Sequence, residues 1–584
     1  MRLIRIGLAN INTTVGALRS NTEKMIEIAS QMAENKCTVG CFQEQCIAGY
    51  PTEDLIQWSG FVRAQWRQLE YFTQTTGNFP CPTVFVLGLT VAEGGHLYNC
   101  AAVVGFGRIL GIVPKEKLPT YGVFYEGRTF SPGNPGHTTQ VYGVPFGDLI
   151  FDFPFGVLGA EVCEDIWVPD GPMRRRAYCG AELVINLSAS PWRAGVLETR
   201  RELISTRAAD NQATVVYTNQ VGGNDALVFD GGGFVCQNGR MLAEAPRWRE
   251  GFMAKVVDLE RTARLRHENT TWRTCCDLFF RENKAFTKLR YQHDGLTQAI
   301  TGGQTEYSYP APGHKSFVLP LAESRANPRE QYFEDLIEGM KIGLAGYFEK
   351  TGVFERIGIA LSGGKDSVLT LIVTWLYARD RFSHLSPEAA REAIGDFIHC
   401  FTMPSRFNSE NTKEIARCVC DELGVTLRIV PIDDAFDREV AAVRAMLGGT
   451  GEPTRVTLQN IQARIRGMRM WDWSNSARAM WVQTGDMSEK AVGYTTIGGD
   501  LMGAYSLLGY LPKTVVIELL RYLGGKFRWQ SIPKLLATKS SPELEEGQEG
   551  EQDLMPFPVL DACFALFAGE KLMPAEVYQA LRTM

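Results

Sequence analysis

The sequence lacks the usual marks of a membrane-spanning, secreted or nucleic-acid-binding protein. Its apolar runs, such as Leu369–Tyr377, are far shorter than a membrane span, and the opening residues Met1–Leu8 are typical of a strand rather than a signal peptide. Lys and Arg number 60 against 66 Asp and Glu, a formal net charge of -6, so no basic excess favours nucleic acid or an anionic membrane. We therefore expect a cytoplasmic protein with no nucleic-acid and no membrane partner.

Patterns for a disulfide framework or a structural zinc site are missing as well. No two of the 14 Cys have C-x-x-C spacing, and none of the 7 His accompanies a Cys pair at zinc-binding spacing. The cysteines are therefore expected to be reduced and mostly buried. What the sequence does have is 584 residues, of which 45% are hydrophobic and 22% charged. That length and composition predict roughly two to four globular domains with large cores.

Two α/β regions follow one another along the chain. In residues 1–262 short β-rich runs alternate with helical patterns, which predicts a layered α/β sandwich. Its predicted elements are a helix over 21–35 and strands over 2–10, 38–44, 83–89, 101–106 and 157–162. Residues 263–325 are polar with scattered aromatic residues, and we expect them to connect the two regions with some helix.

Residues 326–584 show apolar strands separated by helices, which predicts a doubly wound parallel sheet. The predicted strands are 357–361, 396–403 and 427–431, and the predicted helices are 367–378 and 409–423. Near the end of this region the acidic run 543–553 is expected to be a solvated loop.

The most specific local pattern is the glycine-rich loop Ser362–Ser367 (SGGKDS), between the apolar run 357–361 and a helical pattern. Its glycines allow a tight turn and a close approach to an anion, toward which the free N–H groups of a helix N-terminus point. Its serine hydroxyls add donors, and its aspartate can hold a divalent cation beside phosphates. Gly363 is followed by Gly364 rather than Lys, so this is not a Walker A loop. It resembles the PP-loop of ATP pyrophosphatases, which bind ATP, adenylate an acceptor and release diphosphate.

A series of further motifs indicates which molecule is adenylated. In chain order these motifs are Gln459–Arg466, Val482–Glu489, Val492–Thr496, Gly499–Asp500, Leu511–Thr514, Lys539–Leu544 and Gln548. Each alone is an ordinary stretch, since two arginines on one helix usually lie on a solvated face. In this order they resemble NAD synthetases, which amidate nicotinic acid adenine dinucleotide.

That resemblance implies roles for individual residues. The residues that would bind ATP are Ser362, Gly363, Gly364, Lys365, Asp366, Ser367, Thr484 and Lys513. The acceptor dinucleotide would contact Asn460, Arg464 and Glu489, and Mg²⁺ would be held by Asp366 and Glu489. Mg²⁺ and Lys513 would neutralise the diphosphate that leaves when a carboxylate becomes an acyl adenylate. One departure is Asp486, where many members of the family have Asn.

Three motifs in the first region carry the residues that thiol-based amide hydrolysis needs. They are Phe42–Pro51, Pro114–Glu126 and Gly159–Trp167. The thiol of Cys163 must lose its proton to attack, and Glu44 is the candidate base. The tetrahedral intermediate carries an oxyanion, for which Lys115 is the candidate donor and Glu126 a group that could orient this lysine. A buried small hydrophobe remains the usual role of any single cysteine.

Together with Asn186–Pro191, these motifs resemble the nitrilase superfamily, and Gly222–Gly231 is similar to the glutaminase domain of glutamine-dependent NAD synthetases. The resemblance implies that Glu44 is the general base, Lys115 the oxyanion stabiliser and Cys163 the nucleophile. Lys117 is the competing lysine, but Lys115 has the spacing of the family. Glutamine would be bound by Tyr121, Glu164 and Ser190. Val196 stands where many members have Lys or Arg, so Arg193 or another cation would have to serve the substrate carboxylate.

The resemblance spans nearly the whole chain and implies an α-β-β-α sandwich, 1–262, followed by a connecting segment, 263–325, and a PP-loop domain, 326–584. It implies a ligase that cleaves glutamine, passes ammonia between its domains and converts nicotinic acid adenine dinucleotide to NAD⁺ with ATP and Mg²⁺. It also implies a homo-oligomer with a synthetase-domain dimer as its core. The alternatives are a nitrilase/PP-loop amidotransferase that acts on another carboxylate, and a non-catalytic protein that senses dinucleotides.

Overall fold

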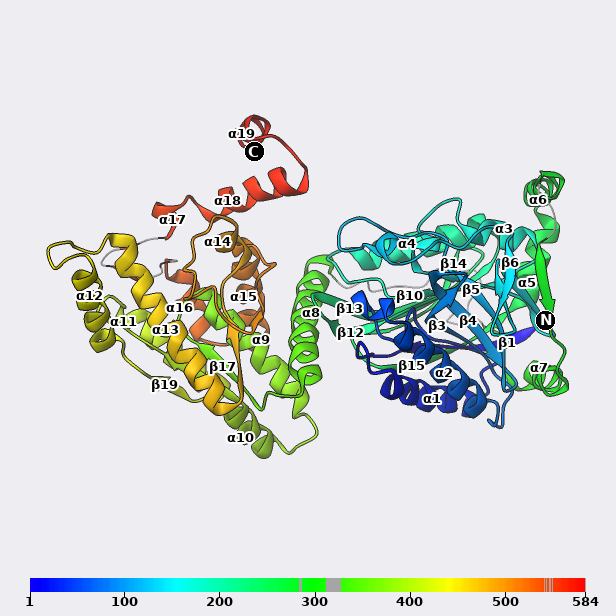
Figure 1. Ribbon diagram of the computed structural model, residues 1–584, viewed down its shortest axis with the longest axis horizontal. Coiled ribbons are helices and arrows are strands. Elements are labelled where there is room, and N and C mark those ends of the chain that lie inside the picture. Colours follow the sequence, from blue (N-terminus) through cyan, green and yellow to red (C-terminus); the bar gives the residue numbers. More distant parts are fainter. Residues whose placement is uncertain are drawn as a thin grey trace. The chain divides into compact units, whose positions relative to one another are not determined.

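The computed structural model describes residues 1–282, 286–310, 327–539, 541, 543–545, 548 and 550–582. It divides into two compact units, Met1–Pro328 and Arg329–Met584, which are described separately below (Figure 1). Within the described residues no helix is long and apolar enough to cross a membrane.

The first unit contains two eight-stranded sheets. One sheet has the order β15 (Gly251–Asp258), β1 (Leu3–Asn10), β2 (Val39–Cys41), β3 (Val84–Glu93), β4 (His96–Gly105), β5 (Arg108–Pro114), β7 (Val144–Gly147) and β6 (Thr138–Val141). The other has the order β12 (Val221–Asn224), β13 (Leu227–Gln237), β11 (Thr214–Asn219), β10 (Leu183–Ser188), β9 (Gly156–Val162), β8 (Leu149–Phe153) and β16 (Thr287–Arg290), with β14 (Arg240–Arg247) paired to β13. The predicted strand over 38–44 is therefore shorter than expected, because the chain leaves the sheet at Cys41.

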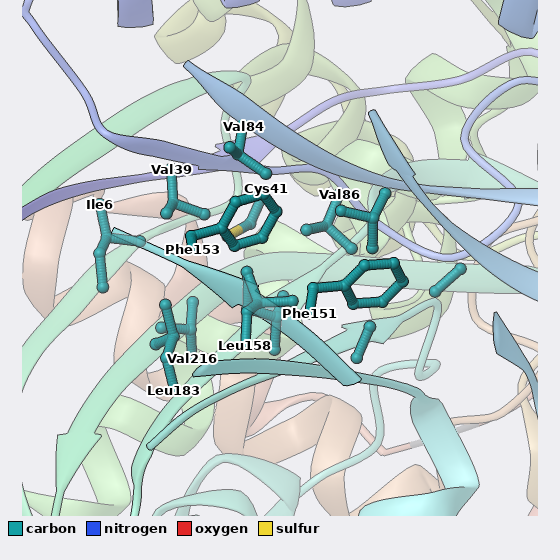
Figure 2. Close-up of a cluster of buried hydrophobic side chains, with 14 of the residues drawn as sticks. Ile6, Val39, Cys41, Val84, Val86, Phe151, Phe153, Leu158, Leu183 and Val216 are labelled. Atoms are coloured by element: carbon teal, nitrogen blue, oxygen red, sulfur yellow. The ribbon is translucent and has the colours of Figure 1, made fainter. Parts of the chain in front are cut away.

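The main core of this unit lies between the inner faces of the two sheets. Figure 2 shows Ile6, Val39, Cys41, Val84 and Val86 of one sheet facing Phe151, Phe153, Leu158, Leu183 and Val216 of the other. Most of these side chains are fully buried, and each large one contributes about 1.5–3 kcal/mol by leaving water.

Helices cover the outer faces of both sheets. The first sheet packs against α1 (Leu18–Glu34) and α2 (Ser59–Thr76), and the second against α3 (Pro172–Tyr178) and α4 (Val196–Asp210), which lie on opposite sides of the unit in Figure 1. The buried residues Met25, Ala29 and Met32 recur at helical spacing on α1 and so form one apolar face. The layered α/β sandwich that the sequence predicts, and the α-β-β-α order that the family resemblance implies, are confirmed.

Part of segment 263–325, which we expected only to connect, belongs to the first unit. Besides the end of α5 (Leu259–Glu268) and all of α6 (Thr270–Glu282), it supplies β16, which pairs in parallel with β8. It also supplies α7 (Asp294–Glu306), whose Leu296 is fully buried in the core between the sheets. Residues 311–325 of this expected segment lie outside the described residues.

The second unit is built on one parallel sheet with the order β19 (Leu427–Ile429), β18 (Ile398–Thr402), β17 (Arg356–Ala360), β20 (Ala479–Gln483) and β21 (Tyr505–Ser506). Its helices are α8 (Pro328–Thr351), α9 (Lys365–Arg381), α10 (Pro387–Phe397), α11 (Glu410–Leu423), α12 (Asp433–Met446), α13 (Arg455–Ala477), α14 (Met487–Ala491), α15 (Lys513–Phe527), α16 (Ser531–Ala537), α17 (Gly550–Asp553), α18 (Phe557–Phe564) and α19 (Pro574–Leu581). The predicted parallel, doubly wound sheet is confirmed, with β17 in its centre.

Two candidate active sites

The first candidate site gathers three residues that follow the ends of three strands. Glu44 lies three residues beyond β2, Lys115 directly follows β5, and Cys163 directly follows β9. β2 and β5 belong to one sheet and β9 to the other, so the sandwich itself brings these segments together. All three side chains are buried, as a reaction that depends on strong electrostatic contacts requires.

Lys115 is held between two carboxylates. Its Nζ lies 2.8 Å from Oε1 of Glu44 and 2.7 Å from Oε2 of Glu126, and its side chain is 0% exposed. Burial alone would lower the pKa of Lys115, but the charges of Glu126 and Glu44 raise it well above its ordinary value. The lysine is therefore a fixed cation, while burial raises the pKa of Glu126 to about 7.

Glu44 is oriented by further donors. Its Oε1 accepts a hydrogen bond of 2.6 Å from the Asn99 side chain, and its Oε2 accepts one of 2.9 Å from the backbone N–H of Ala189. The carboxylate is thus fixed from both the lysine side and the loop after β10. A base held in this way needs little reorganisation to receive a proton.

Cys163 occupies a turn with a backbone φ of 45°, in the left-handed region that non-glycine residues rarely adopt. Burial, followed by the negative charge of Glu44, raises the pKa of the thiol well above its usual value, while the Lys115 charge opposes the rise. The resting thiol is therefore protonated at neutral pH. Attack requires that a neighbouring base remove its proton.

The residues expected to bind glutamine fall into two groups. The Tyr121 hydroxyl donates to both oxygens of Glu164, at 2.9 and 3.0 Å, and its ring is 58% exposed. Ser190 is buried, and its backbone N–H donates to the side-chain oxygen of Asn219 while its hydroxyl accepts from Arg200. Arg200 is itself paired with Asp230 at 2.8 Å.

The structure also describes the positions where the sequence departs from the family. Val196 is the buried first residue of α4, and the nearby Arg193 is exposed. Lys117, the competing lysine, is only partly buried. Lys115, in contrast, is completely enclosed beside Glu44, which favours Lys115 as the lysine of this site.

The second candidate site is a cavity of about 580 Å³ at the carboxyl end of β17. The loop Ser362–Ser367 lines it and opens α9. Gly363 has a φ of 86°, and a Cβ there would overlap the backbone carbonyl of Thr412, so this position requires glycine. The Ser362 hydroxyl accepts from the backbone N–H of Gly364 at 3.2 Å. The loop therefore has the shape of an anion cradle.

The other residues assigned to ATP and the acceptor reach the cavity with one exception. Thr484, Asn460, Glu489 and Lys513 line it, together with all six residues of the loop. Lys365 lines it too, but its Nζ donates to the backbone carbonyl of Thr538 at 2.6 Å.

Arg464 is the exception. It is exposed and donates to the backbone carbonyl of Ile497, whereas Arg466, two residues further along α13, lines the cavity. Burial lowers the pKa of the Arg466 guanidinium to about 10. The structure therefore brings Arg466, rather than Arg464, into the site.

Three carboxylates and one lysine meet beside this cavity, which all of them except the fully buried Asp486 line. Asp366, Asp486 and Glu489 each offer an oxygen, and these oxygens lie within 4.8 Å of one another. Nζ of Lys513 lies 2.6 Å from Asp366, 2.6 Å from Asp486 and 2.8 Å from Glu489, and its side chain is only 2% exposed. Burial raises the pKa of Glu489 to about 8 and that of Asp486 to about 6, and the Asp366 charge adds to both shifts.

This group of carboxylates fits a divalent cation. One lysine cannot balance three carboxylates, and Oδ1 of Asp366 is buried without a hydrogen-bond partner among the described residues. Carboxylate oxygens are the preferred ligands of Mg²⁺. The sequence assigned Asp366 and Glu489 but missed Asp486, which accepts the N–H of Glu489 at the start of α14. The sequence feature that could have indicated Asp486 is its position three residues before Glu489, where an aspartate favours the N-cap of a helix.

The acidic run was expected to be a solvated loop, and its described residues contradict this. Glu543 accepts hydrogen bonds from Ser409 and Thr412 at the start of α11. Gln548 donates to both Tyr494 and Asp553. Their side chains find partners at the cavity, which all six of these residues except Ser409 line. Of the motif Lys539–Leu544, positions 540 and 542 lie outside the described residues.

Comparisons with known proteins cover both units. Residues 5–267 match the family model for carbon-nitrogen hydrolases, and residues 336–583 match the model for NAD synthases. The glutamine-dependent NAD(+) synthetase of Thermotoga maritima is 31% identical over 99% of this chain and 91% of its own length. That of Aquifex aeolicus is 30% identical over 98% of this chain and 91% of its own.

The chain is also similar to solved structures over nearly its whole length. The glutamine-dependent NAD⁺ synthetase from Acinetobacter baumannii, in complex with ADP, is 26% identical and aligns with a TM-score of 0.70 over 99% of this chain and 90% of its own. A second such synthetase, from Cytophaga hutchinsonii, has the same fold, with a TM-score of 0.78 at 22% identity over 100% of this chain and 89% of its own.

Proposed function

The chain belongs to the glutamine-dependent NAD(+) synthetases, a ligase family, and from this premise we propose how its two sites divide the reaction. The first unit hydrolyses glutamine to glutamate and ammonia. The second unit uses ATP to activate the carboxylate of nicotinic acid adenine dinucleotide, and ammonia then converts it to NAD⁺. The observation that carries the proposal is that one chain holds both a buried Glu44–Lys115–Cys163 set and a phosphate cradle opening into a cavity.

In the first site Glu44 accepts the proton of the Cys163 thiol, and the thiolate forms a bond to the amide carbon of glutamine. The carbonyl oxygen becomes an oxyanion beside the Lys115 ammonium, which is fixed in place before the reaction. The intermediate expels ammonia as Glu44 returns the proton to the leaving nitrogen. Water, deprotonated by Glu44, then hydrolyses the thioester to glutamate.

Glutamine is held in this scheme by Tyr121, Glu164 and Ser190. Glu164 and Tyr121 already share hydrogen bonds, so together they form one polar edge that suits the α-amino group of the substrate. The Arg200–Asp230 pair fixes the Ser190 loop rather than contacting solvent. Arg193 is the exposed cation nearest in sequence to Val196 and is proposed to meet the α-carboxylate.

In the second site the loop residues Ser362–Ser367 and Thr484 bind the ATP phosphates, with Lys365 leaving Thr538 to reach them. The acceptor carboxylate forms a bond to the α-phosphorus, and diphosphate leaves. Lys513, whose Nζ lies 2.6 Å from Asp366 of this loop, is proposed to neutralise this leaving group. Ammonia then attacks the acyl carbon, and AMP departs to give NAD⁺.

Asp366 and Glu489 would hold Mg²⁺, and Asp486 joins them as a third carboxylate. When bound, the ion would supply positive charge to the phosphates of ATP. Asn460 and Arg466 are proposed to contact the acceptor dinucleotide, since both line the cavity.

Assembly and location complete the proposal. The family resemblance supports a homo-oligomer built on a dimer of synthetase domains, which light scattering of the purified protein would test. All fourteen cysteines, each within the described part of the chain, are free thiols, which supports a reducing compartment such as the cytoplasm.

The experiment that tests the assigned reaction identifies the products. The purified protein is incubated with ATP, Mg²⁺, glutamine and nicotinic acid adenine dinucleotide, and with a set of other carboxylates in place of the dinucleotide. We expect NAD⁺, AMP and diphosphate only with the dinucleotide, together with glutamate from glutamine hydrolysis. Efficient amidation of another carboxylate, without NAD⁺ formation, would contradict the proposal and support an amidotransferase with a different acceptor.

A further inference from the structure

A buried carboxylate outside the reacting set connects the two halves of the thiol site. Asp165 lies in the short turn Cys163–Ile166 after β9 and is only 1% exposed. Its Oδ1 accepts the backbone N–H groups of Glu116 at 3.0 Å and Lys117 at 2.9 Å. Its Oδ2 accepts the backbone N–H of Val162 at 3.1 Å.

These three donors flank the two residues that must act on the same carbonyl group of the substrate. Glu116 and Lys117 directly follow Lys115, and Val162 directly precedes Cys163. The segments belong to different sheets, since β5 ends at Pro114 in one sheet and β9 ends at Val162 in the other. One carboxylate therefore joins the lysine segment to the nucleophile segment across the sandwich.

The lysine segment leaves its own sheet at this point. The backbone N–H of Lys115 still bonds to Asn99 of β4, but the next two residues donate to Asp165 rather than to a strand. On the other side, Cys163 has a φ of 45°, which is an unfavourable conformation that its surroundings must maintain. Bonds from both flanks to one side chain are suited to hold these two positions at a fixed separation.

We propose that Asp165 is a positioning residue that aligns the Lys115 ammonium with the thiolate of Cys163. This deepens the proposed glutaminase reaction and rests on it. Asp165 does not contact the substrate in this scheme, because both of its oxygens are occupied by backbone N–H groups of the chain. It acts on the step in which the oxyanion forms, where a displacement of about 1 Å costs on the order of 10²-fold in rate.

Two oxygens are needed for this role, so an amide of the same shape should fail. Asparagine has a single side-chain oxygen, and its NH₂ group would face either the Val162 N–H or the pair from Glu116 and Lys117. Asp165→Asn should therefore release one flank while it keeps the volume of the side chain. Loss of one flank displaces lysine and thiol relative to each other without removing either.

The test compares two reactions of the same thiol in the full-length protein. Glutamine hydrolysis needs both Cys163 and Lys115, whereas alkylation by iodoacetamide forms an S–C bond and releases iodide without an oxyanion. In Asp165→Asn we expect the kcat for glutamine hydrolysis to fall by about 10–10²-fold, with KM changed less than about threefold. The alkylation rate of Cys163 should change less than about threefold, since it needs the thiol and its base but no oxyanion donor.

Asp258→Asn is the matched control, because Asp258 is also fully buried and accepts the backbone N–H groups of Arg2 and Glu260 away from the thiol site. We expect it to lower the melting temperature while kcat for hydrolysis stays near the wild-type value. If Asp165→Asn does not fold, Asp165→Glu, which keeps both oxygens on a longer side chain, is expected to show the same separation of rates. Unchanged hydrolysis in the folded variant would overturn the proposal. So would equal losses of hydrolysis and alkylation, since these would place the effect on the thiol alone.

Discussion

The two sites each bury a lysine among carboxylates, but in different proportions. In the first unit Lys115 meets Glu44 and Glu126, two carboxylates for one ammonium. In the second unit Lys513 meets Asp366, Asp486 and Glu489, three carboxylates for one ammonium. Both lysines are almost completely enclosed, so the number of carboxylates rather than burial distinguishes the two environments.

The difference corresponds to the charge that each reaction develops. The thiol site must stabilise a single oxyanion on a neutral amide, and its lysine lies beside Glu44, the proposed base. The second site must hold a triphosphate, and its surplus of carboxylates suits a divalent cation that would accompany it. A similar motif, a buried lysine among acids, is thus adapted to two chemistries by the addition of one carboxylate.

The largest expected effect comes from Cys163→Ala. It should reduce glutamine-driven NAD⁺ synthesis by a factor on the order of 10³ or more, because the residue that attacks the amide is gone. Synthesis from an added ammonium salt should persist, since it needs only the second unit. NAD⁺ formation from each nitrogen source is measured. Failure of ammonium to support synthesis in the folded variant would contradict the separation of the two sites.

The next effect breaks the carboxylate group of the second unit. Asp366→Ala and Glu489→Ala should each lower ammonium-driven synthesis by a factor on the order of 10³, because about 4 kcal/mol of charge stabilisation is lost. Glutamine hydrolysis should persist, since its residues lie in the other unit. Both rates, and the Mg²⁺ concentration for half-maximal synthesis, are measured. A wild-type rate of synthesis in either variant would contradict the assignment of that residue as a Mg²⁺ ligand.

The lysine of the first unit is tested against its neighbour. Lys115→Ala should lower glutamine hydrolysis by about 10²–10³-fold, as expected for loss of an oxyanion donor. Lys117→Ala is the matched control and should have a much smaller effect, because its side chain is not enclosed with Glu44. Glutamate release is the measurement. The reverse order of the two variants would show that the wrong lysine has been assigned.

The smallest expected effect is on the pH dependence of stability and comes from the buried carboxyl group of Glu161. Burial, with the Asp165 charge, raises the pKa of Glu161 to about 8 from an ordinary value of 4.5, and its Oε2 has no hydrogen-bond partner among the described residues. The folded chain favours the protonated form, so this stabilisation is complete below pH 4.5 and is lost as pH rises through about 8.

Glu161→Gln imitates the protonated form and should remove that part of the pH dependence. Between pH 5.5 and 8.5 the melting temperature of the first unit should fall about 2–4 °C less in the variant than in the wild type. Differential scanning calorimetry at the two pH values measures it. Parallel pH profiles for the two proteins would mean that Glu161 is already ionised in the folded chain.

The sequence predicted most accurately those site residues that belong to short local motifs. The loop Ser362–Ser367 and the residues at strand ends, Glu44, Lys115 and Cys163, follow short motifs whose neighbours determine their conformation. That Glu44, Lys115 and Cys163 come together could not be derived from any one motif, because it depends on two sheets packing face to face. Only the order of the motifs, through a family resemblance, indicated it.

Other features could not be predicted from the sequence because they depend on the three-dimensional arrangement of the chain. Arg464 and Arg466 are two residues apart on α13, so they face different sides, and no local pattern says which side lines the cavity. β16 has only four residues and pairs with a strand far away in the sequence. Asp165 accepts bonds from backbone groups, which leave no trace in the side-chain pattern.

The most direct measurement follows the nitrogen atom from one site to the other. Wild-type protein is given glutamine labelled with ¹⁵N in its amide, together with ATP, Mg²⁺ and nicotinic acid adenine dinucleotide, and the product is analysed by mass spectrometry. The account predicts NAD⁺ that carries the label, with at least one glutamate released for each labelled molecule, and no labelled product from Cys163→Ala. Labelled NAD⁺ from Cys163→Ala, or unlabelled NAD⁺ from the wild type with labelled glutamine as the only nitrogen source, would contradict it.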